Sequence, residues 1–201
     1  MAILDERVGA VLAHLEQSGR ENDARETDRA RKRLNLERGT AELLHLLVRT
    51  SRRRRILEIG SSNGYSTIWL AAALRLSGGL PLVSIERDAA KLGQARENLA
   101  RAGLADRVEL IEGDATAVTA ELPGPFDCVF FDADRVSAPA QLRLLLPKLA
   151  ADVLLLADNA LSHPEEIAGY VAAFQELPEF STMIVPVGKG LHIAYRQSLR
   201  A

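Results

Sequence analysis

The stretch "ILEIGSSNGYST", from Ile56 to Thr67, decides the fold of this chain. An apolar run typical of a buried strand enters a turn that contains Gly60 and Gly64, and a helical pattern follows at once. Such strand–turn–helix units bring backbone N–H groups close to a ligand, and in α/β proteins they bind nucleotide-like molecules. The stretch therefore predicts an α/β fold with a binding site at this turn.

Short apolar runs alternate with longer helical patterns from residue 56 onward. The predicted strands are "ILEIG", "PLVSIE", "RVELIEG", "DCVFFDA" and "DVLLLAD", and the predicted helices cover residues 65–76, 88–102, 138–150 and 164–176. This alternation favours right-handed βαβ units and a parallel sheet covered on both faces. The last two runs, "STMIVPV" and "LHIAYRQ", flank Gly188-Lys189-Gly190 and predict a β-hairpin. We therefore predict a Rossmann-like, doubly wound α/β sheet that is mostly parallel and ends in an antiparallel hairpin.

Residues 1–50 lack strand signals and have helical periodicity instead. Their apolar residues form two stripes, Val8, Val11, Leu12 and Leu15 in the first and Leu43, Leu44, Leu46 and Leu47 in the second. The highly charged stretch between them, "SGRENDARETDRARKRLNLERGT", is expected to be a solvated helix or a mobile connector. The length of 201 residues fits a single domain, with residues 1–50 as an N-terminal helical extension and residues 51–201 as the α/β core.

Charge and cysteine content exclude several classes of protein. The chain has 25 Lys+Arg and 27 Asp+Glu, a formal net charge of -2, so we expect no nucleic-acid partner and interpret Arg52 to Arg55 as a solvated turn. A single cysteine, Cys128, excludes an internal disulfide framework and a cysteine-built zinc site. No apolar run approaches the roughly 20 residues that span a bilayer, and the N-terminus does not resemble a secretory signal. We expect a soluble, cytoplasmic protein with no membrane partner.

The spacing of the turn indicates which nucleotide-like ligand it binds. Dinucleotide-binding turns carry G-x-G-x-x-G, whereas here Ser62 occupies the position of the second glycine. Glu58, just before the turn, is an unfavourable neighbour for a pyrophosphate and a favourable one for an ammonium or sulfonium group. The pattern therefore favours S-adenosylmethionine, a cationic nucleoside without phosphate, over NAD.

The next strand ends supply further candidates for this cofactor site. Glu86, followed by Arg87, ends the second strand, where an acidic side chain can accept hydrogen bonds from both ribose hydroxyls. Gly113, Asp114 and Ala115 follow the third strand, where an adenine edge would lie. The complete predicted cofactor site is Glu58, Gly60, Ser61, Ser62, Gly64, Tyr65, Ser66, Glu86, Arg87, Gly113, Asp114, Ala115 and Asp132.

Two acidic strand ends remain, Asp132 in "VFFDADR" and Asp158-Asn159 in "LLLADNA". We expect their strands to be neighbours, so that the side chains converge at the carboxyl edge of the sheet. Two carboxylates and an amide oxygen are hard ligands suited to Mg²⁺, Ca²⁺ or Mn²⁺. The four histidines have no metal-ligand spacing with one another and are interpreted as structural or surface residues.

In this order, "ILEIGSSNGYST", "SIERD", "VELIEGDA", "FDCVFFDADR", "ADNA" and "VPVGKGLHIAYR" resemble the class I S-adenosylmethionine-dependent O-methyltransferases of the metal-dependent caffeoyl-CoA and catechol type. The resemblance covers roughly residues 38–196. It implies a seven-stranded sheet whose last two strands form the hairpin, and a divalent metal, Mg²⁺, bound by Asp132, Asp158 and Asn159. It also implies methyl transfer to a hydroxyl of a small, catechol-like molecule, and a homodimer.

Two departures from the family pattern affect the chemistry. The family usually has a lysine three residues after the first metal aspartate, and this chain has Arg135. Arginine stays protonated, so Arg135 could stabilise an oxyanion but not act as a general base, and Asp132 and Arg135 are the candidate catalytic residues. The second departure is the segment "ALSHP" after Asn159, which lacks the tryptophan- and glycine-containing substrate loop of many relatives.

Three alternatives stay open at this point. The cofactor could serve N-methylation of a nucleic acid or protein, although the balanced charge and the sequence Asp132-Ala133-Asp134-Arg135 after the fourth strand argue against it. The chain could bind the cofactor without catalysis, which would leave the oxygen-ligand set unexplained. An NAD-dependent dehydrogenase is disfavoured by Ser62 and Glu58.

Overall fold

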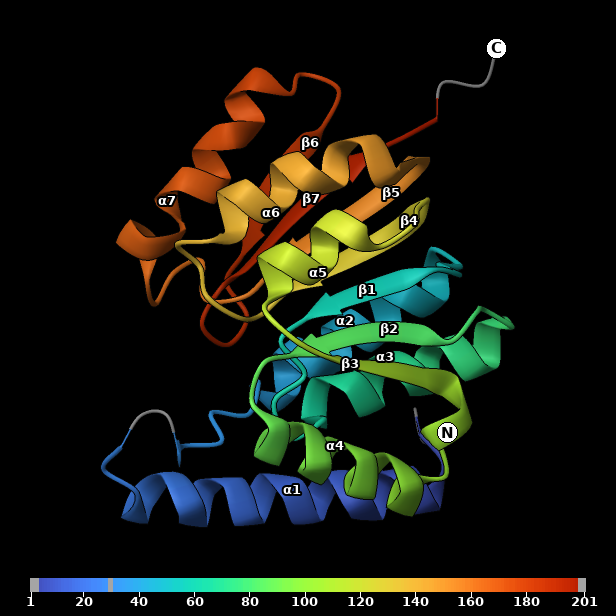
Figure 1. The fold of residues 1–201 in the computed structure, drawn as a ribbon, viewed down its shortest axis with the longest axis vertical. Helices are drawn as coiled ribbons and strands as arrows, with labels where there is room; N and C mark the ends of the chain where they lie inside the picture. The colour runs from blue at the N-terminus through green and yellow to red at the C-terminus, as the bar shows by residue number, and fades with distance from the viewer. Residues whose placement is uncertain (1–3, 29–30, 199–201) are drawn as a thin grey trace.

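The structure is a computed structural model that describes residues 4–28 and 31–198. In this part of the chain seven strands form one sheet with the order β3-β2-β1-β4-β5-β7-β6 (Figure 1). The strands are β1 (Ile56–Ile59), β2 (Leu82–Glu86), β3 (Val108–Glu112), β4 (Phe126–Phe131), β5 (Leu149–Ala157), β6 (Ser181–Val185) and β7 (Leu191–Arg196). Strands β1 to β5 pair in parallel, whereas β7 lies antiparallel between β5 and β6. The predicted doubly wound sheet with a terminal hairpin is confirmed.

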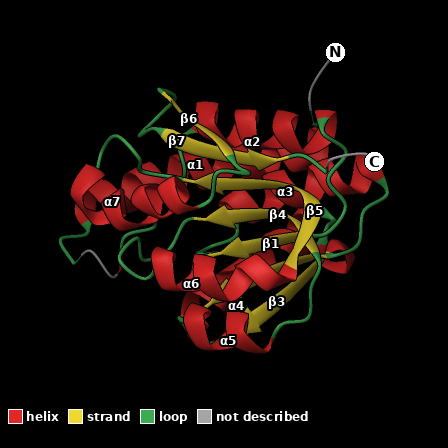
Figure 2. Cartoon of the chain, turned by 90° about the horizontal axis from the view of Figure 1, so that it is seen from above, coloured by secondary structure: helices red, strands yellow, loops and turns green. Residues whose placement is uncertain are grey.

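Helices cover both faces of this sheet (Figure 2). On one face lie α1 (Glu6–Arg25), α2 (Arg38–Thr50), α3 (Tyr65–Ser77) and α4 (Ala89–Ala102). On the other lie α5 (Ala115–Glu121), α6 (Ala138–Leu145) and α7 (Pro164–Ala173). Short 3₁₀ helices span Ala105–Arg107, Leu146–Lys148 and Phe174–Glu176. None of the helices described has both the length and the apolar character needed to cross a membrane.

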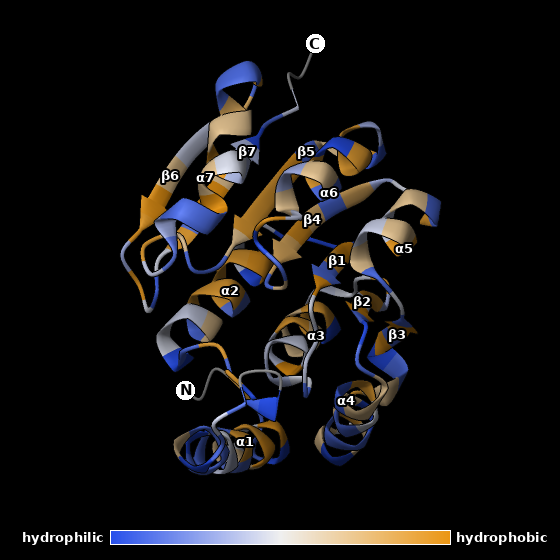
Figure 3. Cartoon of the chain, turned by 60° about the vertical axis from the view of Figure 1, so that its left-hand side comes forward, coloured by the Kyte–Doolittle hydropathy of each residue, from blue (hydrophilic) through white to orange (hydrophobic). Residues whose placement is uncertain are grey.

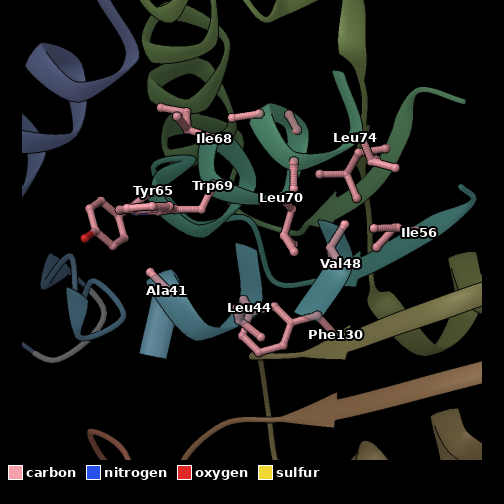
Figure 4. Close-up of a cluster of buried hydrophobic side chains, with 14 of the residues drawn as sticks. Ala41, Leu44, Val48, Ile56, Tyr65, Ile68, Trp69, Leu70, Leu74 and Phe130 are labelled. Atoms are coloured by element: carbon pink, nitrogen blue, oxygen red, sulfur yellow. The ribbon is translucent and has the colours of Figure 1, made fainter. Parts of the chain in front are cut away.

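The two faces of the sheet produce two hydrophobic clusters, because side chains alternate along each strand. On β1, Ile56 belongs to the cluster under α2 and α3, while Leu57 and Ile59 belong to the cluster under α6 and α7. Figure 4 shows the first cluster, in which α2, α3 and strands β1 and β4 contribute side chains around Trp69. Apolar residues dominate the central strands, while outer helices such as α1 are mixed (Figure 3).

Helix α2, in the predicted N-terminal extension, packs in the same hydrophobic cluster as α3 and the central strands. Its residues Ala41, Leu44 and Val48 are fully buried in the first cluster. The single domain of residues 1–201 stays a prediction. Helix α1 also continues through the first part of the charged stretch to Arg25, and residues 29–30 of that stretch lie outside the described residues.

Two sequence predictions near the strands were wrong. The predicted helix at residues 138–150 ends as α6 at Leu145, since Pro147 lacks the N–H group that another helical turn needs, and β5 begins at Leu149. The interpretation of residues 52–55 as a solvated turn fails for Arg53, which is only 6% exposed and donates to the carbonyl of Asp127 and the carboxylate of Asp152.

Candidate active site

The strands that carry the predicted site are neighbours in the sheet, so their carboxyl ends lie at one edge. Three backbone hydrogen bonds extend the parallel ladders one residue beyond the strands: Gly60 N donates to Ile85 O at 2.9 Å, Asp132 N to Ile59 O at 2.9 Å, and Asp158 N to Phe131 O at 3.1 Å. Strands β4 and β5 are direct neighbours, with Phe131 opposite Ala157. The prediction that Asp132 and Asp158 follow adjacent strands is confirmed.

The turn after β1 depends on its glycines. Gly60 has φ +102°, and a Cβ at this position would lie 2.6 Å from the carbonyl oxygen of Asp132. Gly64, with φ +87°, is the residue before α3, and its Cβ position lies 3.1 Å from Cα of Ala95. Left-handed backbone and close approach both require glycine. The same turn places Ser62 at φ +47°, a conformation that serine rarely adopts.

Glu86 joins the first two loops of this edge. Its carboxylate accepts the backbone N–H of Ser62 at 2.8 Å and that of Asp88 at 2.9 Å. Each carboxylate oxygen has further lone pairs, so the half-buried side chain can still accept hydrogen bonds from the hydroxyls of a ligand. The predicted ribose contact of Glu86 fits this geometry and stays a prediction.

Glu58 lies beneath the turn. It has no exposed surface, and its oxygens accept the hydroxyls of Ser66 at 2.6 Å, Thr67 at 2.6 Å and Ser84 at 2.5 Å. Burial raises the pKa of the Glu58 carboxyl, while the three hydroxyl groups oppose this shift. These bonds tie β1 to β2 and to the start of α3, so the structure shows an anchoring role. The predicted contact of Glu58 and Ser66 with the cofactor stays a prediction.

Other predicted cofactor residues also have contacts of their own. The Tyr65 ring is buried, and its hydroxyl donates to Glu16 of α1 at 2.8 Å, so the phenol group points toward α1. Asp114 is exposed and caps α5, a helix that was not predicted, by accepting the N–H groups of Thr116 and Ala117. Gly113 and Ala115 lie on either side of this cap, and Arg87 is exposed after β2.

One buried hydroxyl at the turn indicates that the turn binds a polar ligand. The Ser61 hydroxyl is buried and has no hydrogen-bond partner among the described residues. A buried polar group without a partner costs free energy, and a bound polar molecule removes that cost. The turn therefore fits a ligand that offers hydrogen-bonding groups at Ser61.

Asp132 and Asp158 form an acidic centre beside this turn. Asp132 keeps some exposed surface but is mostly surrounded by protein, and burial, followed by the charge of Asp158, raises its pKa well above the ordinary value. Burial likewise raises the pKa of Asp158 to about 6. Asp158 Oδ1 is buried without a hydrogen-bond partner among the described residues. Two mostly buried carboxyls at neighbouring strand ends, of which the charge of Asp158 disfavours that of Asp132 and one oxygen of Asp158 has no partner, fit a divalent cation.

Asn159 is the third predicted oxygen ligand, but in the structure its amide nitrogen, and not its amide oxygen, lies next to Asp158. Its Nδ2 donates to Asp158 Oδ2 at 2.7 Å, and its Oδ1 accepts the Ser162 hydroxyl at 3.2 Å. A half-turn of the amide exchanges the two atoms and presents an oxygen beside Asp158. Among the described residues, no three His, Cys, Asp or Glu side chains gather as a metal-binding group, so the predicted set depends on this amide.

Two ion pairs flank the acidic centre. Arg135 donates from Nε at 2.9 Å and from Nη2 at 2.6 Å to Glu166 on α7. On the other side, Lys189 Nζ lies 2.9 Å from Glu37 Oε1, just before α2. The charge of Lys189 lowers the pKa of both Asp132 and Asp158, and the charge of Glu37 raises both.

Glu37, Glu166 and Lys189 were not among the predicted site residues. Glu37 precedes a helix of the predicted N-terminal extension, and Lys189 lies between the two glycines of the hairpin turn. For Glu37 and Lys189, the sequence shows only two opposite charges that are far apart along the chain, and this alone does not predict that they meet. The histidine interpretation agrees with the structure for His45 and His192, which are buried in the core, His45 against Trp69 and His192 among Tyr170 and Phe174.

Comparison with known proteins adds independent information. The family described as "Methyltransferase domain" matches residues 57–160, which run from the strand before the turn to the residue after Asn159. The chain is 38% identical over 121 residues to the catechol O-methyltransferase of Mycobacterium tuberculosis and 35% identical over 124 residues to that of Niastella koreensis. Each match covers 60% of this chain and about half of the relative, 54% and 55% respectively.

Solved structures match over nearly the whole chain. The O-methyltransferase from Bacillus cereus in complex with S-adenosylhomocysteine (SAH) is 30% identical, with 94% of this chain and 91% of that chain covered and a TM-score of 0.77. The O-methyltransferase TomG from Streptomyces achromogenes, in complex with S-adenosylmethionine, is 32% identical, with 96% and 90% covered and a TM-score of 0.76. The chain therefore belongs to the class I S-adenosylmethionine-dependent O-methyltransferases of the caffeoyl-CoA and catechol type.

Proposed function

We propose that the chain is an enzyme that transfers a methyl group from S-adenosylmethionine to a hydroxyl oxygen of a small, catechol-like molecule, assisted by a divalent cation such as Mg²⁺. The observation that carries this proposal is the contact between Gly60 and Asp132, where a Cβ would meet the Asp132 carbonyl at 2.6 Å. A methyl donor at the turn and an acceptor at the acidic centre would therefore be direct neighbours. Such proximity is the main contribution that a protein makes to a group transfer.

The residues of the turn are suited to hold the donor. The free hydroxyl of Ser61 and the carboxylate of Glu86 offer hydrogen bonds, and the two glycines let the ligand approach the backbone. The structures of relatives with S-adenosylmethionine and S-adenosylhomocysteine support this choice of cofactor.

The acidic centre is suited to hold the cation and the acceptor. Asp132 and Asp158, with Asn159 after rotation of its amide, would bind the cation, which when bound lowers the pKa of a coordinated hydroxyl and fixes its orientation. Arg135 stays protonated and is held by Glu166, so it stabilises negative charge on the acceptor oxygen but does not remove its proton.

Apolar side chains next to the centre support an aromatic acceptor. Val136 follows Arg135 and is 69% exposed, and Leu161 lies two residues after Asn159 and is 52% exposed. Large apolar groups exposed beside a polar site are typical of a surface that contacts a ligand. The homodimer implied by the family stays a prediction that light scattering can measure.

The experiment is detection of a methylated product by mass spectrometry. The complete chain is incubated with S-adenosylmethionine, Mg²⁺ and a panel of catechols, monophenols and aromatic amines. We expect methylation of a catechol hydroxyl that stops when a chelator is added. Methylation of an amine alone would overturn the assignment of the acceptor, and a product that resists the chelator would overturn the role of the cation.

A further inference from the structure

The hairpin of β6 and β7 leaves part of the sheet uncovered on the side of α2. Strand β6 is the outer strand of the sheet, and β7 is the only described element that it contacts extensively. Residues opposite each other in an antiparallel pair point to the same face, so Met183 shares a face with Ile193, which borders the first hydrophobic cluster. Met183 is nevertheless 59% exposed, and the apolar end of β6 is part of the surface (Figure 3). No described helix therefore covers β6 on this face.

Helix α2 continues this uncovered face. A Cβ at Gly39, in the first turn of α2, would lie 3.5 Å from Val187 Cγ2 in the hairpin turn, so this side of the helix faces the hairpin. Leu43 and Leu46 follow Gly39 at spacings of four and three residues and therefore lie on the same side of the helix. Leu46 is 43% exposed. Together the apolar side chains form a surface that we call the α2–hairpin surface, which consists of Leu43, Leu46, Leu47, Met183, Ile193 and Tyr195.

Two opposite charges on α2 border this surface. Glu42 and Arg49 are about two helical turns apart, so they lie on one side of the helix, one before and one after Leu46. Glu42 pairs with Arg38 of its own helix, whereas Arg49 is exposed and has no ion-pair partner among the described residues. If two copies of α2 pack antiparallel around a two-fold axis near Leu46, Glu42 of each copy lies opposite Arg49 of the other. The surface is therefore complementary to itself in charge as well as in its apolar centre.

We propose that the α2–hairpin surface binds the same surface of a second copy of this chain, with the two α2 helices antiparallel around Leu46. An exposed apolar surface with a charged border is typical of a protein interface, and the two charge pairs set the orientation of the copies. The inference assigns a surface to the homodimer and does not depend on the proposed methyl transfer. It also connects the interface to the site, because Lys189 O and Gly190 O of the hairpin turn accept the N–H groups of residues 160–162, directly after Asn159.

The first experiment measures the oligomeric state of the complete chain by sedimentation velocity at micromolar concentrations, where we expect a dimer. Leu46→Glu and Met183→Glu should each raise the dissociation constant of the dimer roughly 100-fold or more, since each change occurs twice in a symmetric dimer and replaces a buried apolar contact by an unpaired charge. Both side chains are already exposed in the single chain, so the variants should fold as the wild type does, which circular dichroism checks. Leu80→Glu is the matched control and should leave the dimer intact, because Leu80 is 53% exposed in the loop before β2, far from β6 in the strand order.

The second experiment tests the antiparallel arrangement by reversing charges. Glu42→Arg alone and Arg49→Glu alone each place like charges opposite one another in a dimer, and each should raise the dissociation constant roughly 10-fold. In a mixture of the two variants, the introduced arginine of one chain faces the introduced glutamate of the other, and the unchanged Arg49 and Glu42 also meet. Native mass spectrometry of an equimolar mixture should therefore show mixed dimers well above the half that random pairing gives. The thermal unfolding of each variant is recorded as a check of its fold.

Each outcome supports or overturns the inference. A monomeric wild type overturns it, and so does a dimer that Leu46→Glu and Met183→Glu leave intact, because the interface then lies elsewhere, for example on α1. Random pairing of Glu42→Arg with Arg49→Glu overturns the antiparallel arrangement. A dimer that both glutamate substitutions dissociate, with a preference for mixed dimers, supports the proposal. None of these measurements involves methyl transfer, so failure of the proposed function would leave their results unchanged.

Discussion

The carbonyl oxygen of Asp132 lies 2.6 Å from the position that a Cβ would take on Gly60, so the cofactor turn and the acidic centre are in direct contact. Gly60→Ala would place a methyl group in this contact and force alanine to adopt φ +102°. We expect the free energy of unfolding to fall by more than about 1 kcal/mol, measured by urea denaturation, together with a loss of S-adenosylhomocysteine binding. Gly93→Ala is the control, because nothing lies within 4 Å of its Cβ position in α4, and it should raise stability by about 0.5–1 kcal/mol. Equal effects of the two substitutions would contradict the account of the turn.

Glu86 connects the turn to the second strand and faces the proposed ribose position. Glu86→Ala removes the acceptor of the Ser62 and Asp88 N–H groups and the expected acceptor of the ribose hydroxyls. We expect the dissociation constant of S-adenosylhomocysteine, measured by calorimetry, to rise roughly 10-fold or more, since one charged hydrogen bond contributes about 1.5–3 kcal/mol. Glu112→Ala, at the exposed end of β3, should leave the constant unchanged. Unchanged binding in Glu86→Ala would exclude the ribose contact.

Arg135 is proposed to stabilise the oxyanion without taking a proton. Arg135→Gln should lower kcat roughly 100-fold or more on the best acceptor, because removal of one such donor typically lowers kcat by about 100- to 1,000-fold. Glu166→Gln leaves the guanidinium charge in place and should reduce kcat much less, and it should cost little stability because the Glu166 side chain is 46% exposed. An unchanged kcat in Arg135→Gln would remove this residue from the catalytic set.

His192 provides a test of the core on the hairpin side. Burial lowers its pKa to about 4 from an ordinary value of 6.5, so the unfolded chain binds a proton between these values that the folded chain does not. The contribution to stability is therefore present above pH 6.5 and is lost as the pH falls toward 4. Between pH 6.5 and 4.5 the unfolding free energy of the wild type should fall by roughly 1–3 kcal/mol more than that of His192→Phe. Denaturation of both proteins at both pH values measures this difference. His14→Gln, at an exposed position of α1, is the control, and a parallel pH dependence in wild type and His192→Phe would refute the assignment.

Much of the site could be predicted because a parallel sheet brings its carboxyl ends to one edge. Once Asp132 and Asp158 were assigned to neighbouring strands, their proximity followed from topology alone. The burial of Glu58 could have been found by the same reasoning, since a residue inside a strand covered on both faces is buried whichever face it points to. Its hydroxyl partners, which come from α3 and β2, could not.

The ion pairs that escaped prediction join segments that are distant in the sequence. Lys189 meets Glu37 because the hairpin turn packs on the start of α2, and Arg53 meets Asp152 because the start of β5 lies beside the loop before β1. A single sequence records the charges but not which of many opposite charges will meet. Asp114 illustrates a second reason why the sequence was not sufficient. An aspartate directly after a strand can contact a ligand or cap the next helix, and the sequence does not distinguish the two roles.

The central claim is that methyl transfer takes place where the turn meets the acidic centre and depends on the cation held there. The most direct test measures the rate at which methylated catechol forms in the presence of Mg²⁺. It compares the wild type, Asp158→Ala and, as a control, Asp106→Ala, which changes an exposed residue far from the centre. The account predicts that Asp158→Ala loses the product while S-adenosylhomocysteine still binds, and that Asp106→Ala behaves as the wild type. Product formed by Asp158→Ala at the wild-type rate, with or without Mg²⁺, would contradict it.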